Sequence, residues 1–318
     1  MIEVNGLTKV YGRTVAVDDL TFRVEPGTVT GFLGPNGAGK STTMRMILGL
    51  DNPTRGTALI DGQPYSQLRR PLTKIGALLD ANWIHPNRSA RAHLQFLAAS
   101  NKLPRARVGE VLDLVGLTQV GKKNAGQFSL GMKQRLGLAS ALLGDPQVLL
   151  FDEPVNGLDP EGIHWIRTFM KSLAAQGRTV LVSSHLLSEM ALTADHLVVI
   201  GRGKLIAAMS TADFISRSTE STVRVRSPQL ADLAALLQRN GATVVPDGEA
   251  ASVRGLPIEQ IGELAAGAGA VLHELASQQG SLEEAFMQIT GESVEYSTDR
   301  PPAAPTAPAV PTPGPVTR

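Results

Sequence analysis

The chain contains no cysteine among its 318 residues. Disulfide bonds, thiolate metal sites and a cysteine nucleophile are therefore excluded. The sequence also lacks an excess of either charge, because 30 basic residues stand against 29 acidic ones. A broad nucleic-acid footprint needs clustered positive charge, so we expect no nucleic-acid partner.

Long apolar segments are absent as well. No stretch reaches the roughly 18 consecutive apolar residues that span a bilayer, and the first residues lack the basic-then-apolar pattern of a signal peptide. Hydrophobic residues nevertheless make up 42% of the chain, which is enough for a sizeable core. We expect one large and one smaller domain, and any role at a membrane requires a separate spanning partner.

Apolar strands alternate with helical patterns along the first two thirds of the chain. Residues 28–33 and 148–151 are apolar runs typical of buried strands, whereas residues 41–48 and 163–175 have helical spacing. This alternation predicts an α/β domain whose mostly parallel sheet is covered on both faces.

The composition changes after about Ser218. Alternating patterns typical of short strands occur at residues 222–226, 243–245, 251–254 and 271–275, and helical patterns occur at residues 229–238 and 258–266. They predict a small α+β domain without a catalytic cluster. The last residues are rich in Pro, Ala and Thr and are expected to be disordered.

A glycine-rich loop follows the first apolar run and matches the pattern GxxxxGKS. Its glycines let backbone N–H groups turn around phosphate oxygens, and the next helix adds its positive end. The lysine then contacts the β- and γ-phosphates and the serine ligates Mg²⁺. A surface turn with an incidental lysine is the alternative, but the strand before and the helix after favour a nucleotide site. The candidate residues are Gly34, Pro35, Asn36, Gly37, Ala38, Gly39, Lys40, Ser41 and Thr42.

Two acidic residues, Asp152 and Glu153, follow the second apolar run. A carboxylate at the end of a buried strand places Asp152 beside the metal of a bound nucleotide, and Glu153 is then able to orient and deprotonate water. An acidic strand cap is the commoner explanation for such a pair. The presence of Lys40 makes the functional interpretation convincing.

Ser129 and Gly131 lie between these two elements. A serine before a helix is by itself an ordinary N-cap. Its position shortly before Asp152 favours another reading, because the segment Phe128-Ser-Leu-Gly-Met resembles the signature of the ATP-binding-cassette (ABC) family, usually LSGGQ. Leu130 replaces the first glycine and Met132 the glutamine. Other P-loop ATPases lack this element.

Three lesser matches agree with the family's order of motifs. Asp159, in Gly-Leu-Asp, resembles the D-loop that touches the opposite subunit. His185 ends a strand as the family's switch histidine does, and the resemblance implies a γ-phosphate contact, with a purely structural histidine as the alternative. Tyr11 stands where the family places an aromatic residue that stacks on adenine, whereas an ordinary strand tyrosine is the competing interpretation.

One position departs from the family pattern. The family usually has Gln after the strand that corresponds to residues 75–78, and this chain has Asp80. A carboxylate there is able to bind a Mg²⁺-bound water but adds negative charge near the phosphates. We expect altered coupling or metal dependence without loss of ATP binding. Trp83 follows, as a core residue or as an interface anchor.

The resemblance implies a P-loop NTPase of the ABC cassette type over residues 1–215, with a mostly parallel sheet core, an antiparallel β subdomain and a helical subdomain at about residues 82–145. Residues 216–295 would form the accessory α+β domain and residues 296–318 the disordered tail. The implied catalytic residues are Glu153, His185 and Lys40, the implied metal ligands are Ser41, Asp152 and Asp80, and the implied cofactors are ATP and Mg²⁺.

The degenerate signature, and the segment at residues 281–290 in the C-terminal extension, resemble those of daunorubicin- and bacitracin-type drug-export ATPases. This resemblance implies an ATP-hydrolysing subunit that powers export of a drug-like or lipid-like substrate through separate polytopic membrane subunits at the cytoplasmic face of the membrane. A second ATPase subunit, expected as a homodimer and otherwise a paralogue, covers the nucleotide with Ser129 and Gly131.

Two other functions compete with export. A soluble ABC ATPase acting on ribosomes or DNA is disfavoured, because only one phosphate loop occurs and no coiled-coil or zinc insertion is visible. A regulatory module without turnover is disfavoured by Glu153 and His185. The accessory domain is left with three roles: stabilising the dimer, regulating it or seating the partner.

Overall fold

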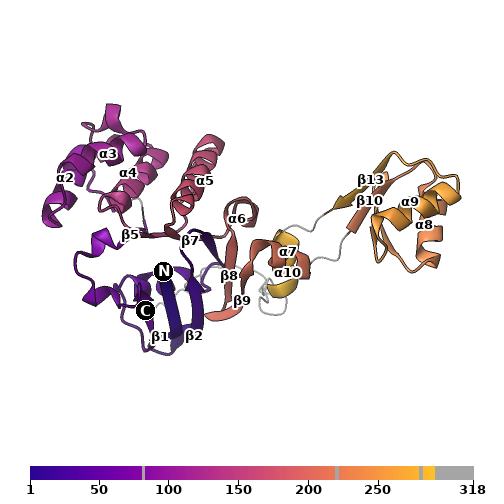
Figure 1. Cartoon of the computed structure of the whole chain (residues 1–318), viewed down its shortest axis with the longest axis horizontal. Helices are drawn as coiled ribbons and strands as arrows, with labels where there is room; N and C mark the ends of the chain where they lie inside the picture. The colour runs from indigo at the N-terminus through magenta and orange to yellow at the C-terminus, as the bar shows by residue number, and fades with distance from the viewer. Residues whose placement is uncertain (81–82, 219–221, 279–281, 291–318) are drawn as a thin grey trace, which may run out of the picture.

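A six-stranded sheet forms the centre of the first part of the chain (Figure 1). The computed structural model describes residues 1–80, 83–218, 222–278 and 282–290. The strand order is β5-β6-β7-β3-β8-β9, and all neighbours pair in parallel except β8 and β9. The strands are β3 (Val29–Leu33), β5 (Ile75–Leu78), β6 (Val148–Phe151), β7 (Thr179–Ser184), β8 (His196–Gly201) and β9 (Lys204–Ser210).

The three central strands are buried along their whole length. Every residue of β3, β6 and β7 is buried, as their apolar sequences predict, because a parallel strand between two covered faces has no solvent side. The carboxyl ends of these neighbouring strands meet at one edge of the sheet. The loops after β3, β6 and β7 therefore gather at that edge.

An antiparallel sheet lies against one side of this centre. Its order is β2-β1-β4, from β1 (Ile2–Tyr11), β2 (Thr14–Val24) and β4 (Arg55–Ile60). Helix α1 (Lys40–Ile47) shares a core with these strands, in which the rings of Phe22 and Phe32 lie 5.4 Å apart. This core anchors the start of α1 beside the end of β3.

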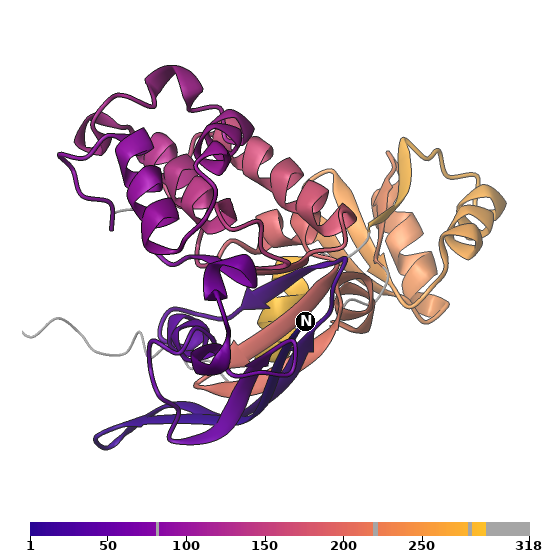
Figure 2. The same cartoon turned by 60° about the vertical axis from the view of Figure 1, so that its left-hand side comes forward.

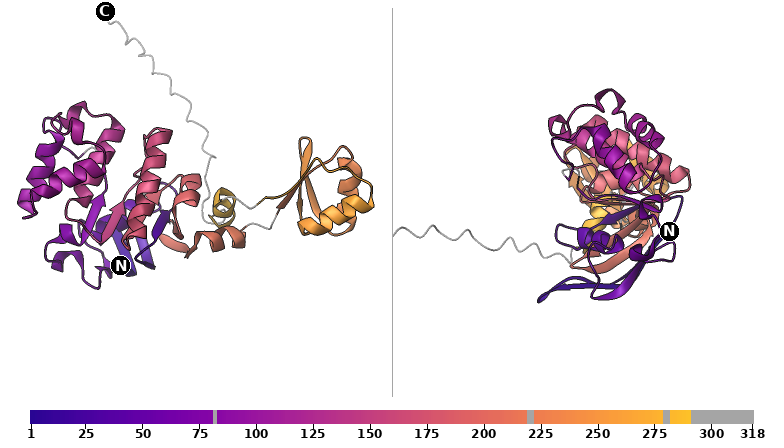
Figure 3. Two further views of the ribbon diagram at one scale, coloured as in Figure 1. Left: turned by 45° about the horizontal axis from the view of Figure 1, so that its top comes forward. Right: turned by 90° about the vertical axis from the view of Figure 1, so that its left-hand side faces the viewer.

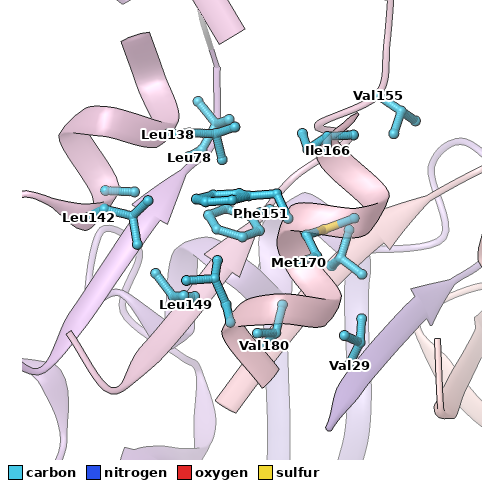
Figure 4. Packing of buried hydrophobic residues seen from close by; sticks show 14 of the residues in the cluster. Val29, Leu78, Leu138, Leu142, Leu149, Phe151, Val155, Ile166, Met170 and Val180 are labelled. Carbon is cyan, nitrogen blue, oxygen red and sulfur yellow. The ribbon is translucent and has the colours of Figure 1, made fainter. Parts of the chain in front are cut away.

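Helices cover the opposite side, as Figure 2 shows. The helices are α2 (Ala90–Ser100), α3 (Ala106–Leu114), α4 (Leu130–Leu142), α5 (Pro160–Ala175), α6 (Leu187–Thr193) and α7 (Thr211–Ser218). Short 3-10 helices also occur at Tyr65–Gln67, Pro71–Thr73, Thr118–Val120 and Ala125–Gln127, and the first of these packs against the core shared with α1 instead. Phe151 packs between Leu138 of α4 and Ile166 and Met170 of α5 (Figure 4). This packing joins the helical layer to the sheet. The first residue of the predicted helical subdomain, Asn82, lies outside the described residues.

A second, smaller unit has a four-stranded antiparallel sheet with order β11-β12-β10-β13. Its elements are β10 (Thr222–Arg226), α8 (Leu230–Arg239), β11 (Thr243–Asp247), β12 (Ala250–Arg254), α9 (Ile258–Gly267) and β13 (Glu274–Gln278). This βαββαβ order is the split βαβ topology of ferredoxin-like domains. The unit has its own core, which includes Val225, Leu237 and Ile261. The predicted α+β character is confirmed.

The last strand of this unit begins later than its apolar pattern predicts. Pairing with β10 places Glu274 opposite Arg226. Val271, at the predicted start, is exposed and its backbone N–H donates to the side chain of Gln229. Pairing with the neighbouring strand therefore overrides the local apolar pattern.

Helix α10 (Leu282–Thr290) returns from the smaller unit to the first one. Leu282 and Ala285 are buried in the same core as Phe214 of α7. Figure 3 shows α10 beside α7, with the smaller unit standing apart. The α+β unit is thus inserted in the chain between two helices, α7 and α10, that pack together. The predicted tail, residues 296–318, lies outside the described residues.

Candidate nucleotide-binding site

The glycine-rich loop connects β3 to α1 in a shape that side chains would disrupt. Gly39 has a φ of 104°, and a Cβ added there would lie 2.6 Å from the carbonyl oxygen of Ala16. A Cβ on Gly34 would lie 2.5 Å from the carbonyl oxygen of Ile200. These approaches to the backbone leave room for glycine alone. The loop therefore has the tight cradle that phosphate binding requires.

Lys40, the first residue of α1, bends back over this loop. Its ammonium group donates to the carbonyl oxygens of Gly34 at 2.6 Å and Pro35 at 3.3 Å. The side chain is only 7% exposed, and this burial lowers the pKa of Lys40 from its ordinary value, while Glu153 and Asp152 oppose that shift. The other predicted loop residues divide into buried Ala38 and exposed Asn36, Gly37 and Ser41, with Thr42 half-buried.

Glu153 lies two residues beyond β6, at the edge of the sheet where the carboxyl ends of the strands meet. One of its carboxylate oxygens is 2.8 Å from Nδ1 of His185, and the other is 3.9 Å from Nζ of Lys40. Its φ is 48°, in the left-handed region that residues other than glycine rarely adopt. This backbone turn, after β6, holds the carboxylate between the imidazole of His185 and the ammonium of Lys40. The structure thus brings together three predicted residues from the segments that follow three neighbouring strands, β3, β6 and β7.

Asp152 and Glu153 share a partner that the sequence pattern did not single out. The hydroxyl of Ser183 donates to Oδ1 of Asp152 and accepts from the backbone N–H of Glu153 at 2.9 Å. The sequence signal that could have identified Ser183 is a polar residue within the apolar run of β7. Its significance depends on β7 lying beside β6.

Ser129 and Gly131 lie in a different place, at the start of α4. Ser129 accepts from the N–H of Met132 at 3.3 Å and caps the helix. Both residues line a cleft of about 510 Å³ together with Asp159 and Trp165. Arg135 lies 4.2 Å from the ring centre of Trp165 in the wall of this cleft. None of the phosphate-loop residues, all of which are described, lines the cleft.

Tyr11 ends β1 and is 47% exposed. Its hydroxyl donates to Asp51 at 3.1 Å, and Asp51 in turn pairs with Arg45 of α1 at 2.8 Å. Partial burial and the hydrogen bond to Asp51 raise the pKa of Tyr11, and the ammonium of Lys9 lies 4.9 Å from the ring centre. The ring is therefore fixed to the helix that follows the phosphate loop.

Asp80 and Trp83 flank residues 81–82, which are outside the described part of the chain. Asp80 is exposed, two residues beyond β5. Trp83 is 65% exposed, so the interpretation of Trp83 as a core residue is wrong.

Comparisons with known proteins agree with this arrangement. The sequence matches the ABC transporter family over residues 17–156. It is 38% identical over 300 residues to the uncharacterized ABC transporter ATP-binding protein YhcH of Bacillus subtilis, covering 93% of this chain and 97% of that protein. The chain belongs to the ABC transporter family of ATP-binding proteins.

Other relatives of this ABC protein have names that mention a substrate. The bacitracin transport ATP-binding protein BcrA of Bacillus licheniformis is 44% identical over 209 residues, 65% of this chain and 68% of that protein. The Nod factor export ATP-binding protein I of Cupriavidus metallidurans is 33% identical over 310 residues, 92% of this chain and 98% of that protein.

A solved ATP-binding subunit of an ABC transporter has the same fold. Its TM-score is 0.63 at 29% identity, over 68% of this chain and 92% of that chain. The predicted ABC cassette is therefore confirmed. Residues 221–283 match a second family, described as a domain of unknown function, DUF8746.

Family membership establishes an ATPase subunit that hydrolyses ATP for transport and implies membrane subunits and dimerisation. In the described part of the chain, no helix has the length and apolar character that crossing a bilayer demands.

The residues of this ABC ATPase fit a magnesium ion that nucleotide phosphates help to hold. Among the described residues, no three His, Asp or Glu side chains form a metal site by themselves. Mg²⁺ rarely uses an all-protein cage and is instead bound by one or two protein ligands with phosphates and waters. The Ser41 hydroxyl and the Asp152 carboxylate, next to Lys40 and Glu153, have the chemistry for that role.

Proposed function

We propose that Glu153, Lys40 and His185 carry out ATP hydrolysis in a site that a second chain completes. The observation that carries the proposal is the position of the Glu153 carboxylate, 2.8 Å from His185 and 3.9 Å from Lys40. A carboxylate in this position is able to take a proton from water while the cation and the imidazole stabilise charge on the phosphoryl group.

The remaining residues bind the nucleotide. The phosphate loop, residues 34–42, surrounds the phosphates, and Lys40 moves from the loop carbonyls to phosphate oxygens. Ser41 and Asp152 would hold Mg²⁺, whose charge would offset that of the phosphates, and Asp80 would supply a carboxylate for a water on that ion. Tyr11 stacks on the adenine.

A second copy of the chain supplies the signature residues. Ser129 and Gly131 begin a helix of 13 residues, whose amino end favours an anion. They line a cleft that contains no residue of their own chain's phosphate loop. Two chains arranged head to tail would place the Ser129 of each opposite the γ-phosphate of the other. We therefore propose a homodimer that ATP holds closed and hydrolysis releases.

The transporter is proposed to be an exporter. Relatives named for bacitracin transport and Nod factor export support a drug-like or lipid-like substrate. The ATPase would bind polytopic membrane subunits at the cytoplasmic face of the membrane, with exposed Trp83 among the contacts. The division into residues 1–215, 216–295 and 296–318 also stays a proposal. The packing of α10 on α7 links the first two of these parts.

The absence of cysteine allows a direct test of the membrane partner, since one introduced cysteine is the only thiol. A maleimide photo-crosslinker on Trp83→Cys should join the chain to a polytopic membrane protein in native membranes. Val15→Cys, on the antiparallel sheet and 50% exposed, is the matched control and should not. Crosslinks to ribosomal or DNA-bound proteins, or none to a membrane protein, would contradict the exporter.

A further inference from the structure

Ser183 occupies a fully buried position between the two acidic residues of the site. It lies on β7, whose neighbours are β6 and β3, and its relative exposure is 0%. Its hydroxyl donates to Oδ1 of Asp152 and accepts from the N–H of Glu153 at 2.9 Å. A single hydroxyl therefore satisfies a side-chain acceptor and a backbone donor of consecutive residues.

Each of these hydrogen bonds restrains one carboxylate. The bond to Oδ1 fixes the rotation of the Asp152 side chain, which leaves Oδ2 as the oxygen available to another ligand. The bond to the amide of Glu153 holds a backbone with φ of 48°, a conformation that persists only where its surroundings determine it. That backbone directs the Glu153 carboxylate to His185 and Lys40.

The adjacent hydroxyl does not share this role. Ser184 is equally buried, but its hydroxyl accepts from the N–H of Leu186 at 2.9 Å, in the turn that leads into α6. Successive residues of a strand point to opposite faces of the sheet. Ser183 and Ser184 thus form a matched pair in which only Ser183 contacts the acidic residues.

We propose that Ser183 is a positioning residue that sets the geometry of Asp152 and Glu153. It does not touch ATP; it acts by holding Asp152 in the orientation that binds Mg²⁺ and Glu153 in the orientation that activates water. The inference rests on the proposed roles of those two residues. Without the hydroxyl, both carboxylates keep their chemistry but lose their fixed directions.

The test compares Ser183→Ala, Ser183→Thr and Ser184→Ala in the full chain. Ser183→Ala should bind ATP in EDTA with an unchanged Kd but gain less ATP affinity when Mg²⁺ is added. Its half-saturating Mg²⁺ concentration should rise several-fold, and its kcat should fall by about tenfold or more. Ser183→Thr keeps the hydroxyl and should restore these values to within about threefold. Ser184→Ala should leave the Mg²⁺ response unchanged.

A purely structural role would give a different result. A Ser183→Ala protein whose kcat and Mg²⁺ response equal those of the wild type overturns the inference. A loss of activity no larger than the loss of folded protein measured in thermal melts also overturns it. Glu153→Gln, measured in parallel, separates this from the proposed function. If Glu153→Gln is inactive while Ser183→Ala is normal, only the inference about Ser183 fails; if Glu153→Gln is active, the assignment of the base fails.

Discussion

A carboxylate oxygen of Glu153 lies 2.8 Å from Nδ1 of His185, although 31 residues separate them in the chain. The contact exists because β6 and β7 are neighbours in the sheet and each residue follows its strand. It gives the proposed base a fixed direction within a partly open site, since Glu153 is 21% exposed and His185 42%.

Glu153→Gln should abolish turnover while leaving ATP binding intact. Gln keeps the size of the side chain but cannot accept a proton from water, so kcat should fall by at least about 100-fold. Phosphate release and ATP titration in the same preparation measure the two effects. Wild-type turnover in this variant would remove Glu153 from the role of base.

His185→Ala should lower kcat by about 100-fold, because it removes the partner of Glu153 and a contact to the transferring phosphoryl group. The matched control is His196→Ala, which removes an exposed histidine at the start of β8 and should be close to wild type. Equal losses in both variants would indicate a general effect on the fold. A normal His185→Ala enzyme would mark His185 as structural.

ATP affinity should depend on pH through Lys40. Burial lowers the pKa of Lys40 below its ordinary 10.5. The charged form binds phosphate, so affinity is complete below this lowered pKa and decreases as the pH rises through it. Titrations from pH 7 to about 10 in EDTA should show the decrease.

Lys40→Arg serves as the control for that titration, because its guanidinium stays charged over the whole range. Whatever its affinity at neutral pH, the Arg variant should not show the alkaline decrease. The same decrease in both proteins would assign the pH dependence to another group.

Tyr11→Ala should weaken ATP binding by about 5- to 100-fold if the ring stacks on adenine, whereas Tyr11→Phe should bind almost normally. The Phe variant removes the hydroxyl that donates to Asp51 and keeps the ring. Fluorescent nucleotide titration distinguishes the two variants. Equal affinity in Tyr11→Ala and wild type would return Tyr11 to the role of an ordinary strand residue.

Much of the cassette could be predicted because its signals are local. The apolar run before Gly34 predicts a buried strand, and the loop and Lys40 must then lie at its carboxyl end. Asp152 after β6 and His185 after β7 follow by the same logic. In each case, the apolar pattern that predicts the buried strand lies next in the sequence to the segment that carries the functional residue.

The contacts that depend on strand order could not be predicted in this way. Ser183 is significant only because β7 lies next to β6, and no local sequence pattern predicts that strand order. The start of β13 and the return of α10 to Phe214 are set by partners far away in the sequence. The cleft that joins Ser129 to Asp159 likewise depends on how α4 and α5 pack.

In the proposed dimer, two chains share each ATP, and the mass of the ATP-bound particle shows whether they do. Light scattering of Glu153→Gln with ATP should give twice the 33.6 kDa mass of the chain. Adding Ser129→Asp should keep the chain monomeric, because the new carboxylate still caps α4 but repels the γ-phosphate of the partner site. Ser89→Asp is the matched control, since Ser89 caps α2 in the same way, accepting from Ala92 at 3.2 Å. A Glu153→Gln chain that binds ATP yet stays at 33.6 kDa, or one that dimerises equally well with Ser129→Asp, would show that the nucleotide site is not shared between two chains.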